Sequence, residues 1–365
     1  MRIVYGVFGY GRGHATRALS VLPELSARHQ LLIVCGGDAW DAISPNYPAL
    51  RIPTLRYVYA GLGRRSLWGT LRANAGAVAD VAFGGAWLRK VATEVERFAP
   101  DLALCDAEPF THRAAQRLGV PRISFDHFGI LRYCRPDLAT GDAPRAARDT
   151  AVYRLLTGDP DAVIVSSFYD APPVRPRVRC VPALLRREIL TAKPSSGEHV
   201  LAYFNNGEHQ FTTEIAGALR AEKIRVHVYG TRRQGREGLV LHRPFGPHFA
   251  EDLASCRAVI STAGNQLVGE ALHLGKPILV SPEDTVEQRA NALAVERLGV
   301  GLRGADGRIG RGLLRDFLDG HARFSSRALS LSRDGRVEAV AAIEAFAREL
   351  VGGHRRMASR AWGYA

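Results

Sequence analysis

The sequence predicts an α/β fold with two doubly wound parallel sheets, because two series of short apolar runs alternate with helical segments. The first series lies at residues 3–8, 31–34, 102–104, 121–125 and 163–165. The second series lies at residues 200–204, 225–229, 258–260 and 278–280. Strands that alternate with helices in this way pair in parallel, so we expect one such sheet in each half of the chain.

A segment of linker composition separates the two series. Residues 192–197 read AKPSSG, and such small, proline-containing segments are typical of connections between domains. We therefore predict a first domain at residues 1–190, a linker at 191–199, a second domain at 200–345, and a C-terminal helix and tail at 346–365. Two Rossmann-like domains facing each other would form a cleft, which is the usual place for a ligand.

The composition limits the class of protein. The chain has 365 residues with 46% hydrophobic content, enough for two domains. Since no apolar run approaches the roughly 20 residues of a membrane span, and the sequence starts directly with a strand, we expect a cytoplasmic protein. Five cysteines are scattered without a Cys-x-x-Cys pair, which favours a reducing compartment.

The net charge of +13 suggests an anionic partner. Nucleic acid, an anionic membrane surface and phosphorylated small molecules would all fit. No zinc-finger or RNA-recognition pattern accompanies the arginine clusters, so we expect no nucleic-acid partner. Peripheral contact with the inner face of a membrane stays open, and GC-rich coding would also produce an Arg- and Ala-rich composition.

The segment from residue 261 to 291 carries the strongest functional signal. After the apolar run at residues 258–260, Ser261 to Gly264 form a turn of small residues, and a helix is predicted at residues 266–274. Such a turn presents backbone N–H groups at a helix N-terminus, which suits a diphosphate. Glu270, one turn into the helix, could accept hydrogen bonds from a ribose. Beyond the next strand, Glu287-Gln288 could hold sugar hydroxyls.

That order of residues resembles the donor-binding segment of GT-B glycosyltransferases, in the branch of MurG-type and UDP-glucuronosyltransferase-like enzymes (families 1 and 28 type). The resemblance implies the GT-B fold, a C-terminal helix that returns to the first domain, and a nucleotide-sugar donor. The implied donor-binding residues are Asn206, Phe245, Gly264, Asn265, Gln266, Glu270, Glu287 and Gln288. The alternative is an ordinary βαβ unit without a ligand.

A glycine-rich motif, GYGRGHA at residues 9–15, follows the first strand. It differs from a dinucleotide fingerprint because Ala15 replaces the last glycine, so no NAD or FAD cofactor is expected. Gly11 and Gly13 would let an acceptor approach the backbone. His14 lies at a helix N-terminus, where the dipole keeps the imidazole neutral, as a general base must be. The resemblance implies this role, and a capping or binding histidine is the alternative.

A base histidine usually needs a carboxylate that orients it. Asp106 ends a buried strand at the same edge of the sheet as His14, and Glu108 is the alternate. We predict that Asp106 orients His14 and that Glu108 and His127 line the acceptor site. His127 could equally be a loop histidine with satisfied hydrogen bonds.

The glycine-rich region at residues 58–87 combines aromatic residues with arginines. Trp68, Phe83 and Trp87 lie near Arg64-Arg65. This combination suits a membrane interface or a large amphipathic acceptor, so Trp68 is a predicted acceptor residue. Alternatively, these aromatics belong to the core of amphipathic helices.

The sequence thus predicts an inverting, metal-independent glycosyltransferase that moves a sugar from a nucleotide-sugar, expected to be a UDP-sugar, to a hydroxyl of a lipid-linked, cell-envelope or secondary-metabolite acceptor. Asp159-Pro160-Asp161 is read as a turn, so no metal is expected. A sugar-nucleotide 2-epimerase and a non-catalytic sugar-nucleotide or polyanion binder are the alternatives.

Overall fold

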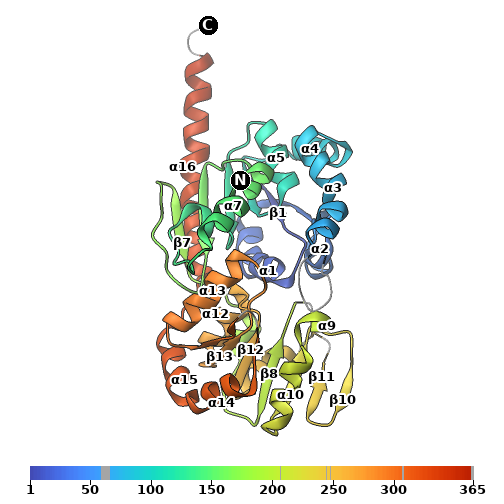
Figure 1. Cartoon of the computed structure of the whole chain (residues 1–365). Coiled ribbons are helices and arrows are strands. Elements are labelled where there is room, and N and C mark those ends of the chain that lie inside the picture. The colour runs from blue at the N-terminus through green and yellow to red at the C-terminus, as the bar shows by residue number, and fades with distance from the viewer. Residues whose placement is uncertain (59–65, 206, 244, 247, 306–307, 363–365) are drawn as a thin grey trace.

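A computed structural model describes residues 1–58, 66–205, 207–243, 245–246, 248–305 and 308–362. It contains two seven-stranded sheets, one above the other in Figure 1, each flanked by helices. The predicted α/β fold with two Rossmann-like units is confirmed. Among the described residues, no helix is long and apolar enough to cross a membrane.

The first sheet has the strand order β3-β2-β1-β4-β5-β6-β7, and all its pairings are parallel. Its strands are β1 (Arg2–Val7), β2 (Gln30–Cys35), β3 (Ala49–Arg51), β4 (Leu102–Asp106), β5 (Arg122–Asp126), β6 (Ala162–Ser166) and β7 (Val178–Val181). Its helices are α1 (Arg12–Arg28), α2 (Gly37–Ile43), α3 (Leu67–Phe83), α4 (Ala86–Phe98), α5 (Pro109–Arg117), α6 (Ile130–Tyr133) and α7 (Ala143–Thr157).

The second sheet has the order β10-β11-β9-β8-β12-β13-β14, and only the β10–β11 pair is antiparallel. Its strands are β8 (His199–Tyr203), β9 (Arg225–Tyr229), β10 (Gly235–Glu237), β11 (Val240–His242), β12 (Ala258–Ser261), β13 (Ile278–Val280) and β14 (Gly301–Arg303). Its helices are α8 (Arg187–Thr191), α9 (Gly207–Gln210), α10 (Thr213–Ala221), α11 (His248–Ser255), α12 (Asn265–His273), α13 (Val286–Arg297), α14 (Arg311–Asp319) and α15 (His321–Ser330).

The strands of each sheet are apolar on both faces because helices cover both faces. In β1, Tyr5 packs in the core beside α1, whereas Val4 packs in the core beside α4 and α5. This alternation follows the two-residue period of a strand. Polar side chains therefore appear where the strands end, and these ends carry the candidate site.

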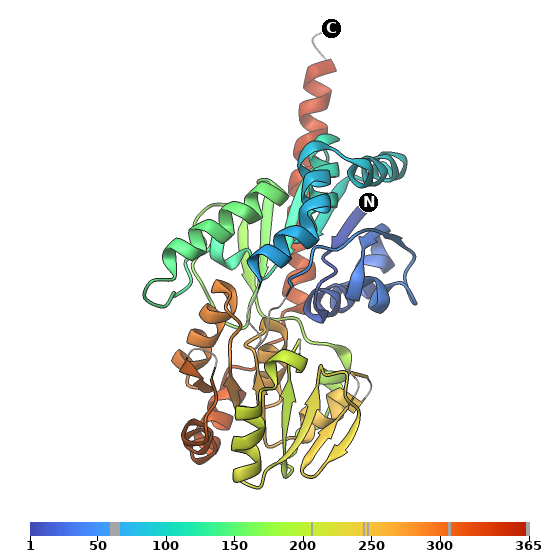
Figure 2. The same cartoon turned by 45° about the vertical axis from the view of Figure 1, so that its right-hand side comes forward.

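The last helix, α16 (Arg336–Trp362), returns to the first sheet. Ala339, Ile343, Phe346 and Leu350 form an apolar stripe at helical spacing and share a core with α1 and β1. The helix runs along the first unit and continues beyond it (Figure 2). The predicted start of the terminal segment at residue 346 is therefore corrected to Arg336, because the stripe begins before residue 345.

Candidate active site

The glycine-rich turn after β1 meets the small-residue turn after β12. The N-terminal ends of α1 and α12 are in contact, and a Cβ added at Gly13 would lie 3.9 Å from the Cβ of Gln266. Gly11 has a φ of 82°, which favours glycine. Neither helix has a side-chain hydrogen bond at its N-cap. Two positive helix ends thus meet where an anion would be stabilised.

His14 and Asp106 are in direct contact at this edge. His14 Nδ1 lies 2.6 Å from Asp106 Oδ1, while the His14 ring packs edge-on against Phe8. A carboxylate only accepts, so Nδ1 donates, and the Nε2 of the neutral ring keeps its lone pair. Asp106 is fully buried, whereas the His14 side chain is 24% exposed. The arrangement can therefore take a proton from an incoming hydroxyl.

Arg17 is a third member of this cluster that sequence reasoning missed. Its Nε donates to Asp106 Oδ2 and its Nη2 to Oδ1, both at 2.8 Å, and Nη2 lies 3.1 Å from His14 Nδ1. Burial alone would raise the pKa of Asp106, but Arg17 and His14 outweigh it and hold that pKa below its usual value. The signal was available: His14 and Arg17 are three residues apart, on one face of a helix.

Glu108 caps a helix of the first domain. It is the N-cap of α5, and its carboxylate accepts from the N–H groups of Phe110 at 2.8 Å and Thr111 at 2.7 Å. Only 2% of Glu108 is exposed, and burial raises its pKa to about 7. Both oxygens are therefore turned onto the helix, and an acceptor role for Glu108 stays a prediction.

His127 and Asn265 form hydrogen bonds between the two domains. His127 lies 2.9 Å from both the Ser166 carbonyl oxygen and Asn291 Oδ1. Asn265 donates to the same Ser166 carbonyl at 3.2 Å and accepts from the N–H of Phe168 at 3.0 Å. We call His127, Ser166, Phe168, Asn265 and Asn291 the interdomain clasp. His127 and Asn265 are nearly fully buried in it, and their acceptor and donor roles stay predictions.

The hydrogen bonds of the clasp fix the orientation of the Asn291 amide. The amide nitrogen of Asn291 donates to the Ala263 carbonyl at 3.0 Å, so its oxygen must face His127. Both ring nitrogens of His127 therefore face oxygen atoms, the Ser166 carbonyl oxygen and Asn291 Oδ1. Glu287 Oε1 also lies 3.9 Å from His127 Nε2. The neighbouring Gln288 accepts from the Glu283 N–H and orders the turn before α13.

Glu270 is buried and already paired. Arg186 donates through Nε to Glu270 Oε1 at 2.8 Å and through Nη2 to Oε2 at 2.7 Å. The amide of Gln266 adds a bond to Oε1 at 3.2 Å. The Arg186 guanidinium also lies 5.6 Å from the centre of the Phe245 ring, and that of Arg12 lies 4.4 Å from it. Glu270 is only 1% exposed, so a ribose could reach it only if the side chains around it moved.

The aromatic residues of the acceptor prediction are exposed. Trp68 is 83% exposed at the start of α3, and Leu71 and Phe83 on the same helix are 63% and 88% exposed. The alternative that places Trp68 and Phe83 in the core is therefore wrong. Asn206, Arg64 and Arg65 lie outside the described residues.

The Asp-x-Asp triplet is bonded to the protein itself. Asp159 pairs with Arg132 at 2.7 Å and with Arg154 at 2.9 Å. Asp161 accepts from the backbone N–H of Arg122 at 2.8 Å. Both carboxylates therefore stabilise the turn before β6.

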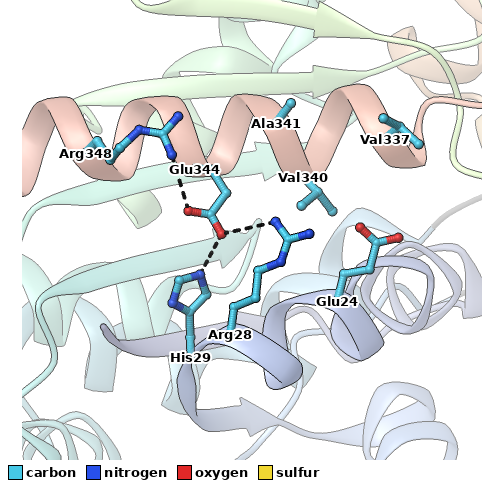
Figure 3. A pocket seen from close by; sticks show the side chains of 8 residues that line it. All are labelled: Glu24, Arg28, His29, Val337, Val340, Ala341, Glu344 and Arg348. Carbon is cyan, nitrogen blue, oxygen red and sulfur yellow. Dashed lines mark hydrogen bonds and ion pairs between the residues drawn. The ribbon is translucent and has the colours of Figure 1, made fainter.

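A surface hollow of about 450 Å³ lies at the opposite edge of the first sheet from His14. Residues from the end of α1 and from α16 line it, and Glu344 there accepts from His29 Nε2 at 2.7 Å (Figure 3). Arg28 and Arg348 also face Glu344, at 4.0 and 3.8 Å. The hollow thus accompanies the packing of α16 on α1 and is separate from the candidate active site.

Solved structures define the class of the fold. MurG from Acinetobacter baumannii aligns with a TM-score of 0.63 and 15% identity, over 94% of this chain and 99% of that chain. A UDP-glucosyltransferase from Polygonum tinctorium aligns at 0.65 and 17%, over 96% and 98%. Glycosyltransferase VinC in complex with dTDP aligns at 0.64 and 16%, over 96% and 100%. At these identities the likeness shows the fold, which is GT-B.

The family model described as glycosyl transferase family 1 matches residues 1–320. The chain therefore belongs to glycosyl transferase family 1, and the predicted resemblance is confirmed. A comparison with curated proteins found no match.

Proposed function

We propose that this glycosyltransferase moves a sugar from a UDP-sugar to an acceptor hydroxyl, inverts the anomeric carbon and needs no metal. The contact between His14 and Asp106 at the edge of the first sheet carries this proposal. It lies beside the meeting point of α1 and α12, where a leaving diphosphate would be stabilised.

The reaction follows from the hydrogen-bond directions. His14 donates through Nδ1 to Asp106, so Nε2 takes the proton of the acceptor hydroxyl. The acceptor oxygen attacks the anomeric carbon from the side opposite the diphosphate, which leaves with the electrons of the broken C–O bond. Asp106 stabilises the imidazolium that forms, and Arg17 holds Asp106 in place.

The donor occupies the second domain. Gly264 and Gln266 lie at the uncapped start of α12, where the diphosphate binds, and Arg12 adds a positive charge from the first domain. Phe245 lies beside the nucleobase, and Glu287 binds the sugar. Glu270 binds the ribose once the side chains around it have moved.

The acceptor approaches over Gly11 and Gly13 and extends toward α3. Exposed Trp68, Leu71 and Phe83 there suit a bulky amphipathic or lipid-linked acceptor, and the same residues suit peripheral docking on the cytoplasmic face of a membrane. Co-sedimentation with anionic vesicles distinguishes the acceptor role from membrane docking. If these residues dock on a membrane, replacing both Trp68 and Phe83 by serine weakens the binding of the protein to the vesicles. If they contact only an acceptor, vesicle binding does not change.

Product analysis with labelled UDP-sugars and dTDP-sugars, with and without EDTA, tests the proposal. Transfer from a UDP-sugar with inverted anomeric configuration, unaffected by EDTA, is the expected result. A free epimerised UDP-sugar would instead identify a 2-epimerase, and binding without turnover would identify a non-catalytic binder. Loss of transfer in EDTA that Mg²⁺ restores would overturn the metal-free mechanism.

A further inference from the structure

Two cysteines far apart in the sequence meet at the edge of the first sheet. Cys134 follows α6, and Cys180 lies in the edge strand β7. Their sulfur atoms are 3.4 Å apart, although 46 positions separate them in the chain. Cys134 is 4% exposed, whereas Cys180 is half-buried, so a small reagent can reach the pair through Cys180.

The backbone around the pair is already clamped. The N–H of Arg135 donates to the Pro172 carbonyl and that of Val174 to the Tyr133 carbonyl, both at 2.9 Å. Between these bonds, Cys134 forms a β-bridge with Pro173. The sulfurs, 3.4 Å apart, would have to approach to the roughly 2.05 Å of a disulfide bond.

The environment also selects Cys180 as the attacking thiol. The hydrogen bond from Cys134 lowers the pKa of Cys180, which favours its thiolate. Cys35, Cys105 and Cys256 are fully buried, and burial raises the pKa of each. These three cysteines serve as unreactive internal references.

We propose that Cys134 and Cys180 form a reversible disulfide when the chain meets a low-molecular-weight disulfide as oxidant. The Cys180 thiolate attacks one sulfur of the reagent and releases one thiol. Cys134 then loses its proton and attacks Cys180 in the mixed disulfide, which releases the second thiol. Two protein thiols are oxidised, and one reagent disulfide is reduced to two thiols.

The bond would brace the loop between β6 and β7. Cys180 Sγ already lies 3.3 Å from the Ala171 carbonyl in that loop, and the same loop contributes Ser166 and Phe168 to the interdomain clasp. A disulfide there adds a covalent link from β7, which follows the loop, to Cys134, whose backbone already pairs with Pro173 of the loop. Oxidation should therefore slow the local opening of the loop next to the donor domain.

The test exposes the folded protein to glutathione disulfide, then denatures and alkylates it for peptide mass mapping. Of the five cysteines, we expect Cys134 and Cys180 to escape alkylation as one cross-linked peptide pair, and dithiothreitol to restore them. Cys134→Ser should instead keep a glutathione adduct on Cys180, because no partner resolves it. Full alkylation of the wild type, or a lasting adduct on its Cys180, would refute the proposal.

Hydrogen exchange of residues 167–173 supplies a second readout that needs no catalytic activity. We expect slower exchange in the oxidised wild type than in the reduced one, and no such difference in Cys180→Ser. Equal exchange in both wild-type forms would reject the bracing of the loop. Both readouts are independent of sugar transfer, so failure of the proposed function would leave them unchanged.

Discussion

The two sheets each present a buried carboxylate held by an arginine through two hydrogen bonds, yet the two pairs differ in origin. Arg17 and Asp106 both belong to the first domain, and Asp106 still accepts from His14. Arg186 comes from the connection before α8 and occupies both oxygens of Glu270 in the second domain. The first pair therefore supports a reactive side chain, whereas the second lies on a carboxylate that is only 1% exposed, so a ligand could reach it only if the surrounding side chains move.

The largest expected effect concerns the side chain that the first pair supports. His14→Ala should lower turnover about 10² to 10⁴-fold, because the acceptor proton loses its base. Affinity for UDP should change little, since the donor side is untouched. Steady-state kinetics and calorimetry measure the two quantities, and a folded His14→Ala protein with near-normal turnover would remove His14 from the mechanism.

Breaking the first pair should affect the fold itself. Arg17→Met leaves Asp106 buried with His14 as its remaining side-chain partner, so the free energy of unfolding should fall by about 3–5 kcal/mol. Arg97→Met is the matched control, because Arg97 is an exposed helix arginine. Urea unfolding measures both variants, and equal stabilities would show that Arg17 does not support Asp106.

Breaking the second pair should change donor binding. Glu270→Ala should weaken UDP binding by about 1.5–3 kcal/mol, or roughly 10 to 150-fold, if the carboxylate holds a ribose hydroxyl. Arg186→Met should tighten it, because Glu270 then keeps only the longer bond from Gln266 among the described side chains. Calorimetry with UDP tests both, and unchanged affinity in Glu270→Ala would show that this residue does not contact the ribose.

The smallest expected effect is the pH dependence of the first pair. The pKa of Asp106 lies below its usual value in the fold. Its ionised form therefore contributes stability above the unfolded pKa of about 3.9, and this contribution is lost as the pH falls through the folded pKa. Arg17→Met should lose less stability on acidification than the wild type. Parallel urea titrations from about pH 6 to 3 measure the two slopes, and identical slopes would contradict the prediction.

The fold was predictable from local patterns, and so was one contact of the site. Strands β1 and β4 are neighbours in a parallel sheet, so the polar residues that follow their apolar runs had to share an edge, which brings Asp106 to His14. The capping role of Glu108 also had a local signal, because Pro109 follows it at the first helical position.

The remaining contacts depend on how the two domains sit together. His127 follows a strand in the first domain, and Asn265 begins a helix in the second. Both positions are typical of residues that contact a ligand, so the sequence predicted such a contact for each. Nothing local shows that they meet at the Ser166 carbonyl, or that Arg186 reaches a carboxylate 84 positions away. Such pairs are set by tertiary packing, which short sequence windows do not contain.

The return of α16 has a consequence for folding during synthesis. All strands of the second sheet lie between residues 199 and 303, and its helices end at Ser330, so that unit is complete before α16 leaves the ribosome. The first unit is translated earlier but lacks Ile343, Phe346 and Leu350 of its core until the end of the chain emerges. The domain translated second can therefore finish folding first, while the earlier one keeps an apolar face open to the cell's chaperones.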